Sequence, residues 1–181
     1  MKAVCKFTEG EKTVFRLTDV PEPQLGSPHE AKIRVESVGV CASDVHALHG
    51  AMHIPEGNIV GHEFAGTVAE VGEAVTSVAP GDRVVSELAI GACGECDMCR
   101  SGRYEFCRVK RPQGWVSPGV YAEYAVSEER LLHRLPAGVA FEEAALTEPL
   151  AICVYGCLER ASIPAGASVV VYGMGSIGLL T

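Results

Sequence analysis

The stretch from residue 39 to residue 63 contains three side chains of the kinds that bind a catalytic metal. Cys41 offers a thiolate, His62 an imidazole nitrogen and Glu63 a carboxylate. This mixture of sulfur, nitrogen and oxygen ligands suits a zinc ion that keeps one coordination position open. The stretch therefore predicts a catalytic zinc site.

Three polar residues follow the first of these ligands, in the sequence GVCASDVH. Ser43, Asp44 and His46 could pass a proton or orient a metal ligand. Ser43 also suits the N-cap of a short helix, so a purely structural role for its hydroxyl stays open. His49 and His53 lie in the loop that follows, and we expect both to be solvated rather than ligands.

A second group of ligands consists of four cysteines with the spacing C-x2-C-x2-C-x7-C: Cys93, Cys96, Cys99 and Cys107. Four thiolates at this spacing can close on zinc with no vacant position, which is typical of a structural site. An iron–sulfur cluster is the main alternative, but the bacterial ferredoxin pattern has a shorter final gap followed by proline. Disulfides are less expected without a secretory context.

The end of the chain resembles the start of a nucleotide-binding unit. A β-branched run at 168–172 is followed by a G-x-G-x-x-G pattern, made by Gly173, Gly175 and Gly178 with Ser176 and Ile177 between them. After a strand and before a helix, such glycines let a pyrophosphate approach the helix N-terminus. We expect NAD or NADP here, and the residue that would choose between them lies about 20 positions further on.

The elements that must position these residues are mostly strands. Short β-prone runs separated by Gly and Pro turns predict a compact, barrel-like body, with strands within 1–7, 12–17, 31–38, 64–75, 80–88, 119–126 and 130–136. In the third run, alternation predicts that Lys32, Arg34 and Glu36 face solvent. The segment 135–160 reads as helical, with an interruption at Pro149.

Composition limits the function classes. The chain has 181 residues, 48% of them hydrophobic and 21% charged, and a net charge of −8, which argues against a nucleic-acid partner. No apolar run approaches the roughly 18–20 residues of a membrane span, and the N-terminus is not a signal peptide. We therefore expect a cytoplasmic protein whose cysteines bind metal or stay as thiols.

With these motifs in order, the chain resembles the zinc-containing medium-chain alcohol dehydrogenases, and among them the sorbitol-type and threonine dehydrogenases. The resemblance rests on GVCASDVH, GHEFAGTVAEVG, the four cysteines, GVYAEYAV, EPLA and GMGSIG. It implies a mainly β GroES-like catalytic domain at 1–150, with its structural zinc lobe at 93–107, followed by the first βα unit of a truncated Rossmann domain at 151–181.

The resemblance also implies roles for single residues. Cys41 and His62 would hold the catalytic zinc, and either Glu63 or Glu148 would complete the set or contact the bound water or substrate. Ser43 would take the hydroxyl proton and His46 would carry it toward solvent, with Asp44 orienting the histidine ligand. The reaction implied is oxidation of a polyol or amino alcohol to a carbonyl, with hydride transfer to NAD or NADP.

Members of this family are about twice as long as this chain. We therefore expect it to be a piece of a longer protein that binds zinc but is inactive alone, and whose full-length form is a dimer or tetramer. A non-enzymatic zinc-binding GroES-like module is the alternative. A zinc-free quinone reductase of the same superfamily is a third possibility, against which Cys41, His62 and the four-cysteine lobe count strongly.

Overall fold

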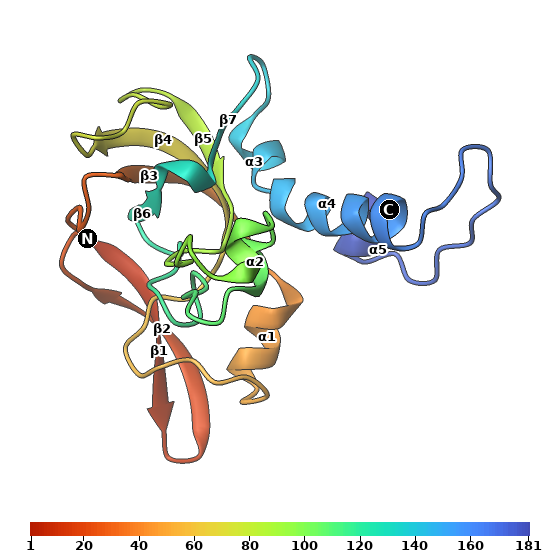
Figure 1. Cartoon of the computed structure of the whole chain (residues 1–181). Helices are drawn as coiled ribbons and strands as arrows, with labels where there is room; N and C mark the ends of the chain where they lie inside the picture. Colours follow the sequence, from red (N-terminus) through yellow and green to blue (C-terminus); the bar gives the residue numbers. More distant parts are fainter.

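The computed structural model describes residues 1–181, and its main element is a curved antiparallel sheet (Figure 1). Its five strands pair in the order β6-β3-β4-β5-β7, with bounds Tyr124–Glu128, Glu30–Gly39, Glu63–Val71, Arg83–Ser86 and Leu132–Arg134. The β3–β4 ladder has two register irregularities, and such bulges bend and twist a sheet. The mainly β architecture expected from the sequence is confirmed.

A second sheet is the hairpin of β1 (Lys2–Glu9) and β2 (Lys12–Asp19). Its turn contains Gly10 at φ +61, a left-handed conformation that glycine adopts without steric cost. Isolated bridges pair Ala3 with Ala122 and Cys5 with Ile59. The hairpin therefore holds together two segments, around residues 60 and 121, that lie far apart in the sequence.

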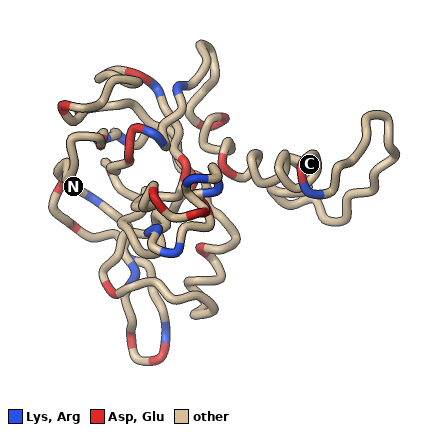
Figure 2. Tube along the Cα trace, in the orientation of Figure 1, with Lys and Arg blue, Asp and Glu red and all other residues tan.

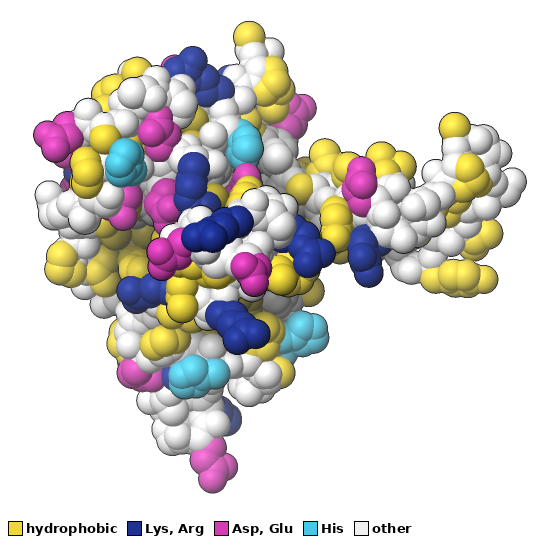
Figure 3. Space-filling model, viewed as in Figure 1, with side chains coloured by type: hydrophobic (Ala, Val, Ile, Leu, Met, Phe, Trp, Pro, Cys, Tyr) yellow, Lys and Arg dark blue, Asp and Glu magenta, His cyan; other side chains and the backbone are white.

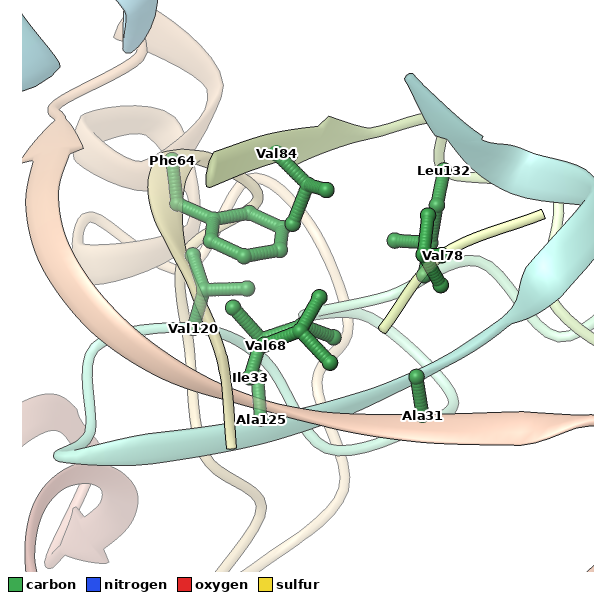
Figure 4. Packing of buried hydrophobic residues seen from close by; sticks show 9 residues of the cluster. All are labelled: Ala31, Ile33, Phe64, Val68, Val78, Val84, Val120, Ala125 and Leu132. Carbon is green, nitrogen blue, oxygen red and sulfur yellow. The ribbon is translucent and has the colours of Figure 1, made fainter. Parts of the chain in front are cut away.

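The main core lies on the inner face of the curved sheet. Figure 4 shows nine buried side chains from several strands directed toward one another: Ala31, Ile33, Phe64, Val68, Val78, Val84, Val120, Ala125 and Leu132. Burying an aliphatic side chain of this size stabilises a fold by about 1.5–3 kcal/mol. This core fixes the relative positions of β3 and β4, the two strands that lead to the predicted catalytic zinc site.

The expectation that Lys32 faces solvent is wrong. Lys32 is only 8% exposed, and its Nζ lies 2.9 Å from Glu22 Oε1 and 2.7 Å from Glu70 Oε2. Two carboxylates compensate the loss of water around the ammonium group, so burial of this side chain is tolerated. Alternation along β3 gave no sign of these partners, because both lie outside the strand.

Short helices connect and extend the sheet. They are α1 (Ala42–Leu48), α2 (Asp97–Arg100), α3 (Phe141–Ala144), α4 (Thr147–Val154) and α5 (Ser176–Leu180), with 3-10 turns η1 (Tyr104–Phe106) and η2 (Glu129–Leu131) and a π-helical segment η3 (Tyr155–Arg160). The segment around Pro149 forms two helices, but the interruption lies between Ala144 and Thr147 and not at Pro149 as expected. Proline lacks an N–H and is tolerated only in the first turn, which is its place in α4.

The chain from α4 to the C-terminus extends away from the β body (Figure 1). Residues 161–181 contain no charged side chain (Figure 2), and apolar side chains cover much of this arm (Figure 3). The strand predicted at 168–172 is not formed, because no neighbouring strand offers hydrogen-bond partners. None of the helices combines the length and the apolar character needed to cross a membrane.

Candidate metal centres and active site

Cys41, His62 and Glu63 come together where β3 ends and β4 begins. The antiparallel register pairs Gly39 with Glu63, so the residues just beyond the two strand ends become neighbours. One ligand atom from each of the three side chains lies within 4.8 Å of the others. His62 and Glu63 are each 5% exposed, whereas Cys41 is half-buried. The ligands are thus pre-assembled on a rigid ladder with one partly open side.

The Glu63 carboxylate occupies space that only a glycine at position 39 leaves free. A Cβ atom on Gly39 would lie 2.2 Å from Glu63 Oε2, far inside van der Waals contact. The bare backbone of Gly39 therefore allows the carboxylate to lie over the end of β3, toward Cys41.

His62 presents its two ring nitrogens to different neighbours. Nδ1 lies 3.5 Å from Asp44 Oδ1 and has no closer hydrogen-bond partner, and Nε2 lies 3.5 Å from Ser43 Oγ. A carboxylate beside one ring nitrogen favours the tautomer that leaves the other nitrogen free to bind a metal. Nε2 is therefore the ligand atom that this arrangement offers.

The charges around His62 affect its pKa more strongly than its burial does. Burial alone would lower the pKa of His62, but the nearby Asp44 carboxylate, with smaller contributions from Glu148 and Glu63, raises it. Burial likewise opposes ionisation of Asp44, yet the nearby His62 and the hydrogen bond from Tyr121 hold the pKa of that carboxyl below its usual value. The site therefore concentrates negative charge, which suits a cation.

Glu148, on α4, lies close enough to His62 and Glu63 to interact with their charges. It is half-buried, and burial raises its pKa, with His62 lowering it and Glu63 adding to the increase. It lines a cavity of about 600 Å³ together with Phe64, Val85 and Ala151. The charges of His62 and Glu63 act on Glu148, so this residue links the ligand cluster to a cavity with room for a small molecule.

Ser43 and His46 both lie on α1, but only Ser43 contacts the ligand cluster. Ser43 is half-buried and His46 is exposed, and their three-residue spacing puts them on one face of the helix. The helix begins at Ala42 with Cys41 as its N-cap, and the Cys41 N–H donates to Asp44 Oδ2 at 3.1 Å. The expectation that Ser43 caps this helix is wrong, since Asp44 supplies the side-chain acceptor.

The four-cysteine lobe brings its sulfurs together around α2. All four Sγ atoms lie within 4.8 Å of one another, with Cys93 Sγ 3.9 Å from Cys99 Sγ and 3.7 Å from Cys107 Sγ. A tetrahedral ion with Zn–S bonds of about 2.3 Å separates its sulfurs by roughly 3.8 Å. The backbone N–H groups of Cys93 and Val109 lower the pKa of Cys107 to about 6, which favours the thiolate. This lobe fits zinc.

The remaining thiols and imidazoles lie outside both clusters. Cys5 and Cys153 are buried, Cys157 is half-buried, and His49 and His53 are exposed. None of them belongs to a group able to hold a metal ion.

The glycine-rich turn has the shape that its pattern predicts. Gly173 has φ +93, and a Cβ on Gly178 would lie 1.9 Å from the Gly173 carbonyl oxygen. Glycine at 178 thus lets α5 pack directly against the turn, with Ser176 and Ile177 in its first turn. The turn fits the start of a dinucleotide cradle, where the first and third glycines have these two roles.

The family model described as the alcohol dehydrogenase GroES-like domain matches residues 27–137. The chain belongs to the zinc-containing medium-chain alcohol dehydrogenase family. The matched residues include Cys41, His62, Glu63 and the whole four-cysteine lobe, so both clusters lie within the family domain.

Individual relatives agree with this assignment. Sorbitol dehydrogenase from Halalkalibacterium halodurans is 42% identical over 99% of the chain and 52% of the relative. Galactitol-1-phosphate dehydrogenase from Escherichia coli has a TM-score of 0.90 at 28% identity, covering 99% of the chain and 51% of the solved chain. The cobalt- and zinc-bound alcohol dehydrogenase from Pyrobaculum aerophilum has a TM-score of 0.82 at 34% identity, covering 99% and 54%. The chain spans about half the length of these proteins.

Two aromatic residues lie near His62 without a sequence signal that predicts it. The Trp115 ring centroid lies 5.7 Å from that of His62, while its side chain also packs on the cluster around Ile54. Tyr121 hydrogen-bonds to Asp44. Backbone hydrogen bonds from the Tyr121 N–H to the Val60 carbonyl and from the Val4 N–H to the Tyr121 carbonyl bring Tyr121 to this place.

Proposed function

We propose that the protein to which this chain belongs oxidises an alcohol to a carbonyl compound, with a catalytic zinc ion held by Cys41, His62 and Glu63. The observation that carries the proposal is the convergence of these three donors within 4.8 Å of one another. Glu148, whose pKa responds to the charges of His62 and Glu63, lines a cavity. Bound there, zinc would supply a Lewis acid that makes an alcohol hydroxyl easier to deprotonate. A relative that contains cobalt and zinc supports the choice of metal.

The chain's own residues have distinct roles in this proposal. Ser43, with Oγ 3.5 Å from His62 Nε2, accepts the proton of the substrate hydroxyl, and His46, exposed on the same helix, passes it to solvent. Glu148 faces the same site from α4 and accepts a hydrogen bond from a substrate hydroxyl. Asp44 holds the His62 ring in place.

The electron acceptor in the proposal is NAD or NADP. The turn formed by Gly173, Gly175, Ser176, Ile177 and Gly178 would bind its pyrophosphate, because glycines leave the backbone N–H groups accessible. A bound nicotinamide supplies the hydride acceptor. We assign residues 1–150 to the catalytic domain, with the structural zinc lobe at 93–107, and 151–181 to the start of the nucleotide-binding domain. Because the chain alone has no paired strand at 168–172, we expect it to be inactive by itself.

The substrate class that we propose is a polyol or an amino alcohol. Two relatives have names that refer to polyol substrates, sorbitol dehydrogenase and galactitol-1-phosphate dehydrogenase. Glu148 offers a carboxylate, able to accept a hydrogen bond from a second hydroxyl or from an amino group. The cavity of about 600 Å³ that it lines accommodates such a molecule.

The test is an activity measurement on the full-length protein with sorbitol, galactitol and L-threonine, each with NAD and with NADP. We expect the wild type to reduce NAD or NADP with at least one of these substrates. Cys157→Ser, which changes a thiol outside both clusters, should keep this activity, and Cys41→Ser should lose it. Full activity in Cys41→Ser would overturn the zinc mechanism. A zinc-loaded wild type that is inactive with every combination of substrate and cofactor would instead favour a zinc-binding module without catalysis.

A further inference from the structure

Tyr121 connects the metal site to a part of the chain that contributes no ligand. Its hydroxyl lies 2.7 Å from Asp44 Oδ2 and 2.9 Å from the carbonyl oxygen of Gly39. A neutral phenol is a hydrogen-bond donor with one proton, and both neighbours are acceptors. The shorter contact, to an ionised carboxylate, is the stronger hydrogen bond.

This hydrogen bond acts on one oxygen of Asp44 and leaves the other for the histidine. Oδ2 accepts from the Tyr121 hydroxyl and from the Cys41 backbone N–H at 3.1 Å. Oδ1 faces His62 Nδ1 at 3.5 Å. Asp44 is only 3% exposed, so water does not replace these donors. Two fixed donors on Oδ2 determine the plane of the carboxylate and therefore the direction in which Oδ1 points.

The Tyr121 ring is itself held in a single place. A Cβ on Gly61, which directly precedes His62, would lie 2.2 Å from Tyr121 Cδ1. The ring therefore packs closely against the bare backbone of Gly61, which has φ +87. It also packs against both the main core and the cluster around Ile54. The ring thus positions the hydroxyl rigidly rather than allowing it to move between rotamers.

We propose that Tyr121 is a positioning residue of the catalytic metal site, which sets the orientation of the His62 ring by fixing the Asp44 carboxylate. The inference rests on the proposed function in one respect, that His62 binds the metal. Partners that orient a histidine ligand typically change metal affinity about 10–100-fold when they are removed. Tyr121→Phe keeps the ring and its packing and removes only the hydroxyl, so its effect should appear at this site and not in the four-cysteine lobe.

The experiment measures cobalt binding to the full-length protein after removal of the catalytic metal. Wild type, Tyr121→Phe and Tyr124→Phe are compared by titration and by the visible absorption bands of the cobalt ion. Tyr124 lies three residues further along and its hydroxyl makes no hydrogen bond, which makes it a matched control. We expect about 10–100-fold weaker binding and shifted bands in Tyr121→Phe only, with the metal of the four-cysteine lobe retained in all three proteins.

A second comparison separates positioning through Asp44 from a general effect on the fold. If Tyr121 acts through Asp44, the double variant Tyr121→Phe, Asp44→Asn should bind cobalt about as weakly as Asp44→Asn alone, since effects that share one route are not additive. Additive losses in the double variant would overturn the proposed route.

The outcomes distinguish this inference from the proposed function. Wild-type affinity and spectrum in Tyr121→Phe would overturn the role of Tyr121 and leave the zinc site standing. A wild-type protein that takes up metal only in the four-cysteine lobe would overturn both. Because the readout is metal binding, neither conclusion depends on finding the substrate.

Discussion

Gly39 and Glu63 face each other across the β3–β4 ladder so closely that a Cβ on Gly39 would lie 2.2 Å from Glu63 Oε2. The carboxylate thus lies against bare backbone at the end of β3, two residues before Cys41. The space left by the glycine therefore accommodates the buried Glu63 carboxylate, which has no side-chain hydrogen bond to fix its position. The absence of a side chain at 39 is therefore part of how the metal ligands are arranged.

Gly39→Ala should displace Glu63 and weaken metal binding at the catalytic site. We expect at least a roughly 10-fold loss of zinc affinity, comparable to the loss of an orienting partner. The measurement is zinc release to a chromophoric chelator, with Gly156→Ala as control because a Cβ at 156 meets nothing within 4 Å. Equal release rates for the two variants would contradict this view of Gly39.

Cys107→Ser should remove the metal of the lobe and leave the catalytic site loaded. Cys107 is 3% exposed and lies 3.7 Å from Cys93, so its loss opens the tetrahedral set. A structural metal stabilises the fold directly, and a loss of about 2 kcal/mol would lower the melting temperature by roughly 4–8 °C. Metal analysis and thermal melting check this, with Cys157→Ser as control. A melting temperature unchanged by Cys107→Ser would show that the lobe needs no metal.

The ion pair of Glu56 with Lys6 predicts a pH-dependent contribution to stability. Hydrogen bonds from Lys6 Nζ and from the Thr8 N–H and hydroxyl lower the pKa of Glu56 from 4.5 to about 2. A carboxyl whose folded pKa is depressed stabilises the fold above its unfolded pKa, and this contribution is lost as the pH falls toward the folded pKa.

Glu56→Gln should therefore lower the melting temperature near neutral pH, and its difference from the wild type should shrink as the pH falls from about 4.5 toward about 2. Melting curves of both proteins across this range check the prediction. Glu11→Gln, in an exposed residue without an ion pair, should show no such trend. A difference that stayed constant with pH would contradict the assignment.

Ile33→Ala should destabilise the body that carries the catalytic site. Ile33 is fully buried on β3 among the core side chains, and truncation of such a residue costs about 2–5 kcal/mol. Urea unfolding measures this cost, with Leu17→Ala as the control because Leu17 is 69% exposed. Similar losses for the two variants would mean that the inner face of the sheet is not the main core.

The sequence predicts well those features that depend on nearby residues. The four cysteines of the lobe lie within fifteen positions, and their spacing alone indicates one metal. In the glycine turn, whose residues are also adjacent in the sequence, Gly173 has a positive φ, which glycine adopts without steric cost. Cys41 and His62 lie further apart, and their proximity depends on the register of β3 with β4. The resemblance to a family implied that register, whereas the residue pattern alone does not.

Features that depend on distant partners were predicted poorly. Lys32 is buried because Glu22 and Glu70 reach it from other segments. Asp44, and not Ser43, completes the start of α1, since a carboxylate at the third helical position accepts the N–H of the cap residue. The hydrogen bond from Tyr121 to Asp44 spans 77 positions, and no local pattern announces it.

The central claim is that one metal ion lies between Cys41, His62 and Glu63. Anomalous X-ray diffraction at the zinc absorption edge, from crystals of the full-length protein grown with zinc, locates every such ion directly. We predict one peak among the four cysteines of the lobe and a second peak within bonding distance, about 2.0–2.3 Å, of Cys41 Sγ and His62 Nε2. A peak in the lobe with none at Cys41 and His62 would contradict the account.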